Sequence, residues 1–179
     1  VIKMLSLSRD KARESFAAHV AALRIVPVSI SYELDPCDAL KANELWQRGS
    51  TGSYHKNELE DVASIGHGIA GHKGRVHLHF GVPLGDGLQS PQAVAAAIDE
   101  QVLRGYRLHP SNLFAYRRLH GRGAPPGVDI APGSCSQRAF DARIEALPAQ
   151  QRQYALAAYA NALVSKLSLP EYAPATTAS

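Results

Sequence analysis

Histidine is the residue type of this chain best suited to proton transfer or metal binding, and the sequence contains eight of them. Four fall within a short stretch: His67, His72, His77 and His79. Two imidazoles on one strand face could bind a single metal ion. No cysteine lies in this stretch and the intervals match no common zinc pattern, so we expect no metal site. A metal-dependent hydrolase is the weakest of the functions considered.

Arginine offers a second kind of chemistry, the binding of phosphate or carboxylate groups. The segment from Gln101 to Val128 has no acidic residue, and three aromatic residues are interleaved with its positive charges. Its arginines are Arg104, Arg107, Arg117, Arg118 and Arg122. Such a surface suits an anionic lipid headgroup, the phosphates of CoA or an acyl-carrier protein, although a plain solvated helix face is an equal alternative. No nucleic-acid-binding motif accompanies it, so we expect no nucleic acid partner.

Two strands are predicted to position these groups. Residues 25–33 alternate, with apolar side chains at positions 26, 28, 30 and 32, which predicts a strand with one buried face. Pro27 cannot donate a ladder hydrogen bond, so it belongs near the strand start or at a sheet edge. Residues 75–82 predict the second strand, with His77 and His79 opposite its apolar face.

Helical patterns fill most of the remaining chain. Apolar spacing predicts helices over residues 9–24, 35–47, 57–70 and 110–120, a helix capped by Ser90 and Pro91, and two late helices around Phe140 and Tyr159. Gly/Ser and Gly/Pro loops are expected at residues 48–54 and 121–132. Two strands alone would expose their edges, so we expect part of a larger α/β sheet, with a small α+β domain as the alternative.

Bulk composition is typical of a soluble globular protein. The 179 residues are 45% hydrophobic and 20% charged, with a formal net charge of +3. The two cysteines, Cys37 and Cys135, make no disulfide scaffold and favour a reducing compartment. No apolar run is long enough to span a bilayer. The expected location is therefore cytoplasmic.

Several segments, taken in order, carry a resemblance to a known family. They are Ile25-Val26-Pro27-Val28, Tyr32-Glu33-Leu34-Asp35-Pro36, Gly52-Ser53-Tyr54-His55-Lys56, Glu60-Asp61-Val62-Ala63-Ser64-Ile65 and Phe80-Gly81-Val82-Pro83-Leu84. In order and spacing they resemble the C-terminal half of bacterial glycerol-phosphate and lysophosphatidate acyltransferases. The resemblance covers roughly residues 1 to 120 and implies an acyltransferase-like α/β sheet with flanking helices and a helix-rich C-terminal region.

The resemblance also implies substrate-binding residues. Val26 and Pro27 would lie beside the acyl pocket, and Lys56 and Asp61, with Glu60, would lie near the substrate entrance. The plainer alternatives are a strand-edge proline and a solvated helix start, where acidic residues suit the helix dipole. The resemblance implies no cofactor beyond the acyl donor, acyl-CoA or acyl-carrier protein. The acceptor would be a glycerol-phosphate-type alcohol.

The family's reaction depends on a His followed, after four residues, by an Asp, and that pair is absent here. The residues five positions after the eight histidines are Arg24, Glu60, His72, His77, Val82, Leu84, Phe114 and Pro125. His55 with Glu60 is the nearest imitation. The Glu-Gly-Thr-Arg-like block that holds phosphate in the family is missing as well. Catalytic residues are therefore expected upstream, and the chain alone is expected to show no acyl transfer.

These observations lead to two main functional expectations. The first is a phospholipid acyltransferase acting at the inner face of the cytoplasmic membrane, of which this chain is a part. The second is a non-catalytic module that binds lipid or acyl-carrier protein. The expected organisation is an acyltransferase part over residues 1–88, a helical extension over 89–169 and a disordered tail over 170–179.

Overall fold

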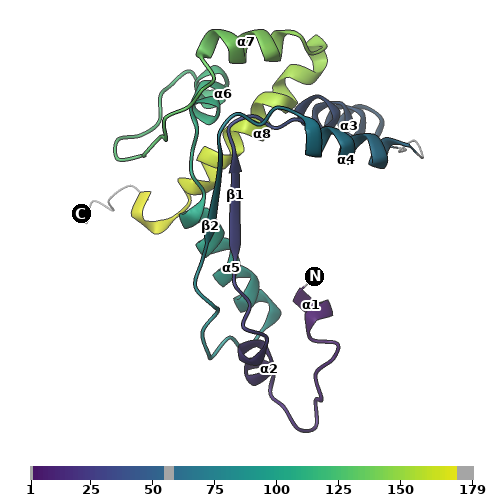
Figure 1. The fold of residues 1–179 in the computed structure, drawn as a ribbon, viewed down its shortest axis with the longest axis vertical. Coiled ribbons are helices and arrows are strands. Elements are labelled where there is room, and N and C mark those ends of the chain that lie inside the picture. The colour runs from purple at the N-terminus through teal and green to yellow at the C-terminus, as the bar shows by residue number, and fades with distance from the viewer. Residues whose placement is uncertain (1, 55–58, 173–179) are drawn as a thin grey trace. The chain divides into compact units, whose positions relative to one another are not determined.

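The computed structural model describes residues 2–54 and 59–172. These residues are rich in helix and contain one small antiparallel sheet, so the α/β class is confirmed at this coarse level (Figure 1). The strands are β1 (Val28–Tyr32) and β2 (Val76–Phe80). The helices are α1 (Ile2–Leu5), α2 (Phe16–Leu23), α3 (Asp38–Thr51), α4 (Glu60–Ala70), α5 (Pro91–Gly105), α6 (Pro110–His120), α7 (Gln137–Glu145), α8 (Ala149–Lys166) and the 3-10 turn η1 (Pro170–Tyr172).

The chain forms two compact units, and both strands run from one unit into the other. Unit 1 contains the described parts of Val1–Ile30, His77–Tyr106 and Leu169–Ser179, and unit 2 those of Ser31–Val76 and Arg107–Ser168. The domain boundaries expected at residues 88 and 169 stay predictions. Of the tail predicted over 170–179, the first three residues form η1 and the rest lie outside the described residues.

The register of β1 and β2 gathers their alternating apolar residues on one face. Glu33 N donates to Arg75 O at 2.9 Å, and Gly81 N donates to Pro27 O at 2.8 Å, so these residues face each other across the two strands. Odd-numbered residues therefore form the hydrogen-bonded pairs. Even-numbered residues form the other pairs, whose side chains lie closest together. The facing pairs set by this register are Val26–Val82, Val28–Phe80, Ile30–Leu78 and Tyr32–Val76.

Burial of β1 reverses what its alternation suggests. One face is buried, as predicted, but it is the polar one: Pro27, Ser29, Ser31 and Glu33 are buried. The apolar residues at positions 26, 28, 30 and 32 are each at least 37% exposed. Alternation shows that the two faces differ, whereas other segments of the chain decide which face is covered. Assigning burial to the apolar face was therefore wrong.

Unit 1 builds its core away from the strands. Val20, Leu84 and Val94 are buried together. Partly buried residues pack against them: Ile2, Phe16, Ile25, Leu88, Ala97 and Ile98. The predicted cap of α5 is confirmed, since Ser90 Oγ accepts a hydrogen bond from Ala93 N at 3.1 Å and Pro91 opens the helix. The helix predicted over 9–24 begins only at Phe16, where Ser15 caps α2.

Unit 2 is built around α6 and α8. The ring of Phe140 on α7 meets the Tyr159 ring edge-on at 5.1 Å, which contributes to a core that also contains Ile144 and Leu163. The helix predicted over 110–120 is confirmed with those bounds. The helix predicted over 35–47 begins at Asp38 and continues through Thr51, so the loop predicted from residue 48 was placed too early.

The predicted apolar stripe of α4 is present but exposed. Its residues are Leu59, Val62, Ile65 and Ile69, each more than 60% exposed. No helix within residues 2–54 and 59–172 combines the length and the apolar character needed to cross a bilayer.

Candidate functional site

Two of the segments that carry the family resemblance lie side by side in unit 1. Gly81 N donates to Pro27 O, and Leu84 N donates to Ile25 O, both at 2.8 Å. Pro27 immediately precedes β1. Because proline has no N–H, Pro27 takes part in the strand pairing only through its carbonyl oxygen. Pro27 is buried while Val26 is exposed. These hydrogen bonds join two segments more than fifty positions apart in sequence, where β1 begins and β2 ends.

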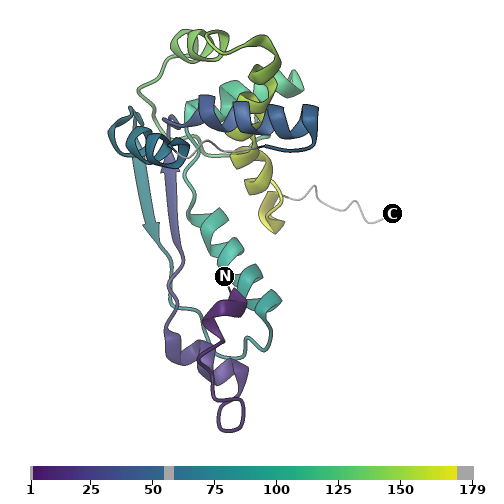
Figure 2. The same cartoon turned by 90° about the vertical axis from the view of Figure 1, so that its right-hand side faces the viewer.

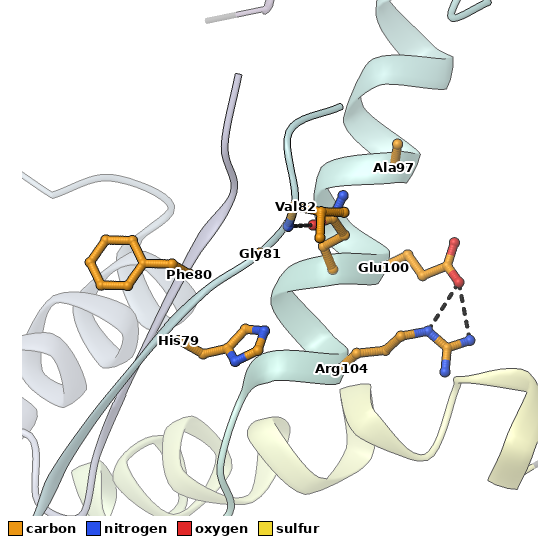
Figure 3. A pocket seen from close by; sticks show the side chains of 8 residues that line it. His79, Phe80, Gly81, Val82, Ala97, Glu100 and Arg104 are labelled. Carbon is orange, nitrogen blue, oxygen red and sulfur yellow. Dashed lines mark hydrogen bonds and ion pairs between the residues drawn. The ribbon is translucent and has the colours of Figure 1, made fainter. Parts of the chain in front are cut away.

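A hollow of about 410 Å³ opens beside this junction, between the end of β2 and α5 (Figure 3). It is lined by His79, Phe80, Gly81, Val82, Ala97, Glu100, Gln101 and Arg104. Gln101 Oε1 accepts a hydrogen bond from Val82 N at 2.9 Å, which ties the helix to the strand end. Pockets of this size hold small organic ligands or part of a longer apolar chain.

A glycine lets α5 approach the ribbon beside this hollow. A Cβ at Gly105 would lie only 2.2 Å from Cδ2 of the His79 ring, so any larger residue there would force the ring or the helix to move. The His79 side chain points toward the C-terminal end of α5, whereas Phe80 points away from the helix (Figure 3). His79 therefore supplies a polar group at one end of a hollow whose other lining is largely apolar.

The positive charge at the hollow is already matched by carboxylates. The Arg104 guanidinium lies 3.0 Å from Glu100 Oε1 and 2.8 Å from Glu171 Oε1. An added phosphate would have to compete with both. The geometry therefore fits an uncharged or apolar group better than a phosphate.

Of the predicted substrate-entrance residues, Glu60 and Asp61 belong to unit 2, and Asp61 is exposed in the first turn of α4. Lys56 lies outside the described residues. A hollow of about 360 Å³ is lined there by Leu40, Asn43, Tyr54, Leu59, Glu60 and Ala63. The Tyr54 hydroxyl donates to the Glu60 carboxylate, and this bond raises the pKa of Tyr54 to about 12.

The predicted arginine surface is divided between the units. Arg104 belongs to unit 1, and Arg107, Arg117, Arg118 and Arg122 belong to unit 2. Arg118 pairs with Asp141 at 3.1 Å and with Glu145 at 2.7 Å. Among the described residues no carboxylate pairs with the side chains of the other three unit 2 arginines, which are exposed.

His19 is a buried histidine that sequence patterns did not single out. Its Nδ1 lies 2.8 Å from Glu14 Oε2, and its Nε2 lies 3.1 Å from Leu5 O. Both nitrogens are engaged and the residue is buried, so the ring clamps the N-terminal segment and presents no nitrogen to a substrate. No cluster of three or more potential metal ligands occurs in the described part of the chain.

A highly coordinated polar group of unit 2 was also missed: Glu33, which is fully buried at the end of β1. Its Oε1 accepts hydrogen bonds from Ser134 N and Cys135 N, both at 2.7 Å. Its Oε2 accepts from Arg75 N at 3.0 Å and Ser134 Oγ at 2.7 Å. Burial alone raises the pKa of Glu33, but these hydrogen bonds outweigh it and hold that pKa below its usual value.

Two glycines leave space for the Glu33 carboxylate. They are the sequence feature from which a closely packed group at this place could have been predicted. A Cβ at Gly74 would lie 2.6 Å from Glu33 Oε2, and one at Gly133 would lie 2.4 Å from Oε1. Gly74 also has a φ of +63°, which favours glycine. Because every acceptor site of Glu33 is used by the protein, the group fastens loop 133–135 to β1 and is not open to a ligand.

A second buried network joins α3, α7 and α8. Arg143 Nε donates to Asp38 Oδ2 at 2.5 Å, and the Tyr159 hydroxyl donates to the same oxygen at 2.8 Å. The Tyr159 oxygen also accepts from Asp35 N at 3.0 Å. Burial, followed by the Asp38 charge, raises the pKa of Tyr159, so its phenol stays protonated. The network is closed on itself and stabilises the helices.

Comparison with known proteins identifies no relative of this chain. No family model, no characterised protein and no solved structure matches this chain. Function must therefore be argued from the chain's own residues. The hollow of unit 1 is the site best suited to a ligand, since the buried groups of Glu33, Asp38 and Tyr159 are already engaged by protein partners.

Proposed function

We propose that this chain is the acyl-binding part of a glycerolipid acyltransferase, which moves a fatty acyl group from acyl-CoA or acyl-carrier protein to a glycerol-phosphate-type acceptor. One observation carries the proposal. The segments around Pro27 and Gly81, on which the family resemblance rests, are hydrogen-bonded neighbours beside a largely apolar hollow of about 410 Å³. Such a hollow suits the hydrocarbon chain of a fatty acyl group.

The chain's own residues would bind and orient the acyl group. Val82 and Ala97 offer apolar contact, and the hydrogen bond between Gln101 and Val82 keeps the walls of the hollow together. The His79 imidazole stands at the polar end, where a thioester or ester carbonyl could accept a hydrogen bond. Proton transfer from the acceptor alcohol needs a base held by an acid. That pair would be supplied from outside these 179 residues.

Acyl binding can be tested on the chain itself. We expect palmitoyl-CoA to displace a fluorescent fatty-acyl probe, and we expect Ala97→Phe, which fills the hollow, to weaken binding at least tenfold. Ala96→Phe is the matched control, because Ala96 is exposed on the same helix and does not line the hollow. Far-UV circular dichroism of both variants checks that the helix is retained.

Catalysis is tested with the protein purified from its native cells and, separately, with the isolated 179-residue chain. We expect transfer of radiolabelled acyl groups to glycerol 3-phosphate or lysophosphatidate by that protein, and none by the isolated chain. If the chain binds no acyl group and the cellular protein transfers none, the proposal is refuted.

A second candidate function is a non-catalytic module that binds anionic lipid or acyl-carrier protein. It is supported by the arginines of unit 2 whose side chains lack a described acidic partner, Arg107, Arg117 and Arg122. Acyl binding or vesicle binding without transfer by the cellular protein would favour it over the enzyme.

A further inference from the structure

The antiparallel pair formed by residues 26–30 and 78–82 of unit 1, called the ribbon below, has an exposed apolar face. We define the ribbon face as Val26, Val28, Ile30, Leu78, Phe80 and Val82, whose exposed fractions run from 39% to 68%. All six belong to unit 1 and alternate with polar or small residues along their segments. Contiguous apolar patches of this kind on a protein surface mark interaction sites.

Unit 1 leaves most of this face uncovered while it covers the opposite one; Phe80 and Val82, at the end of the face, also line the hollow beside α5. α5 packs on the polar side, where Gly105 meets the His79 ring and Gln101 approaches Gly81. Figure 2 shows α5 on one side of the strands. The unit's buried cluster around Val20, Leu84 and Val94 uses none of the six residues, so its packing does not depend on them.

We propose that the ribbon face is a homodimer interface, on which a second copy of this chain packs face to face. Two ribbons stacked in this way form a four-stranded sandwich, with sheets about 10 Å apart. A two-fold axis between them makes the contact isologous, so the same six residues serve both copies. This proposal goes beyond the acyltransferase assignment and does not rest on it.

Three properties of the face fit a second copy. First, no member of the ribbon face carries a charge, so two chains of net charge +3 meet without burying like charges there. Second, the bulkiest side chain of the face, Phe80, lies between two smaller ones, because Val28 faces it on the other strand and Val82 follows it two positions later. In a dimer, Phe80 of one copy can therefore pack against the valines of the other copy. Because the same face carries both the large Phe80 side chain and the small valines that it would pack against, the face suits isologous packing.

The third property is area. Six apolar side chains with these exposed fractions present roughly 500 Å² per copy, near the upper range for the largest patch of a monomer. Pairing two such faces buries roughly 1,000 Å² in total, which reaches the lower limit for a specific interface. The dimer is therefore expected to be concentration-dependent.

Sedimentation equilibrium and light scattering of the intact chain across a wide concentration range test the proposal. We expect the mass to rise from that of one chain to that of two, and no further. Phe80→Thr and Leu78→Thr, which keep strand propensity, should each weaken the dimer at least tenfold. Ile69→Thr is the matched control, since Ile69 is more exposed than either and lies on α4 in unit 2. It should leave the dimer unchanged.

A monomer at every concentration overturns the proposal, whatever the folding behaviour of the variants. So does a dimer that Ile69→Thr disrupts as much as Phe80→Thr. A monomer that co-sediments with lipid vesicles and loses that binding with Phe80→Thr would assign the face to a membrane. A monomer that pairs only with a different polypeptide would assign it to that partner, and both results contradict a second copy.

Discussion

Glu33→Gln tests whether the buried carboxylate at the end of β1 fastens unit 2 together. The change keeps the size of the side chain and removes only its charge and one acceptor oxygen. The amide oxygen can still accept from Ser134 N and Cys135 N, but the new NH₂ group faces Arg75 N–H, which is itself a donor. Hydrogen bonds to a charged group contribute about 1.5–3 kcal/mol each, and an unsatisfied buried donor costs about 1–3 kcal/mol. We expect Glu33→Gln to lower the free energy of unfolding by about 2–4 kcal/mol at pH 7.

The pH dependence provides an independent check of the same contact. Because the pKa of Glu33 is lowered in the folded state, its stabilisation is fully present above the usual glutamate pKa. It is lost as the pH falls through the lowered folded pKa. Wild type should therefore lose its advantage over Glu33→Gln on acidification, and the two unfolding free energies should converge.

Urea unfolding followed by tryptophan fluorescence measures both effects, because the single tryptophan, Trp46, lies on α3 in unit 2. Glu44→Gln is the matched control: Glu44 forms an (i, i+4) pair with Arg48 on the same helix, which contributes about 0.3–0.5 kcal/mol. A loss below about 1 kcal/mol for Glu33→Gln, or two curves that stay parallel from pH 7 to pH 3, would refute the reasoning.

Three further predictions concern other contacts. Tyr159→Phe removes two buried hydrogen bonds and should lower the free energy of unfolding by about 1–3 kcal/mol in urea titrations; an unchanged midpoint would contradict this. Gly105→Ala places a methyl group against the His79 ring and should lower the thermal midpoint by several degrees, or displace the His79 resonances in NMR spectra if the ring moves instead. Arg117→Gln should weaken binding to vesicles of anionic lipid more than Arg118→Gln, because carboxylates already neutralise Arg118. Equal losses in co-sedimentation would show that the ion pairs do not govern the binding.

Local signals allowed the helices to be predicted closely. The Ser90-Pro91 pair marked the start of α5, and the bounds of α6 were predicted to the residue. Capping and apolar spacing act within a few positions, so a single sequence records them. The start of α2 was missed because residues 9–15 continue the apolar spacing but form turns before the Ser15 cap.

Burial and long-range contacts could not be predicted in the same way. The alternation of β1 indicated two different faces, but its coverage depends on loop 133–135 and on residues of other elements. Glu33 appeared as an ordinary polar strand position, because its partners Arg75 and Ser134 lie 42 and 101 residues away. The hollow beside Gly81 depends in the same way on a helix that begins ten residues later.

The fastening of Glu33 to loop 133–135 also has a consequence for the kinetics of folding. The bonds from Glu33 to Ser134 and Cys135 close loops of 101 and 102 residues, so ordering them early would be entropically costly. We expect contacts of such separation to form after the local helices have assembled, on the native side of the transition state. Weakening them should accelerate unfolding and leave the folding rate almost unchanged. We therefore expect Glu33 to affect the unfolding rate of unit 2 more than its folding rate.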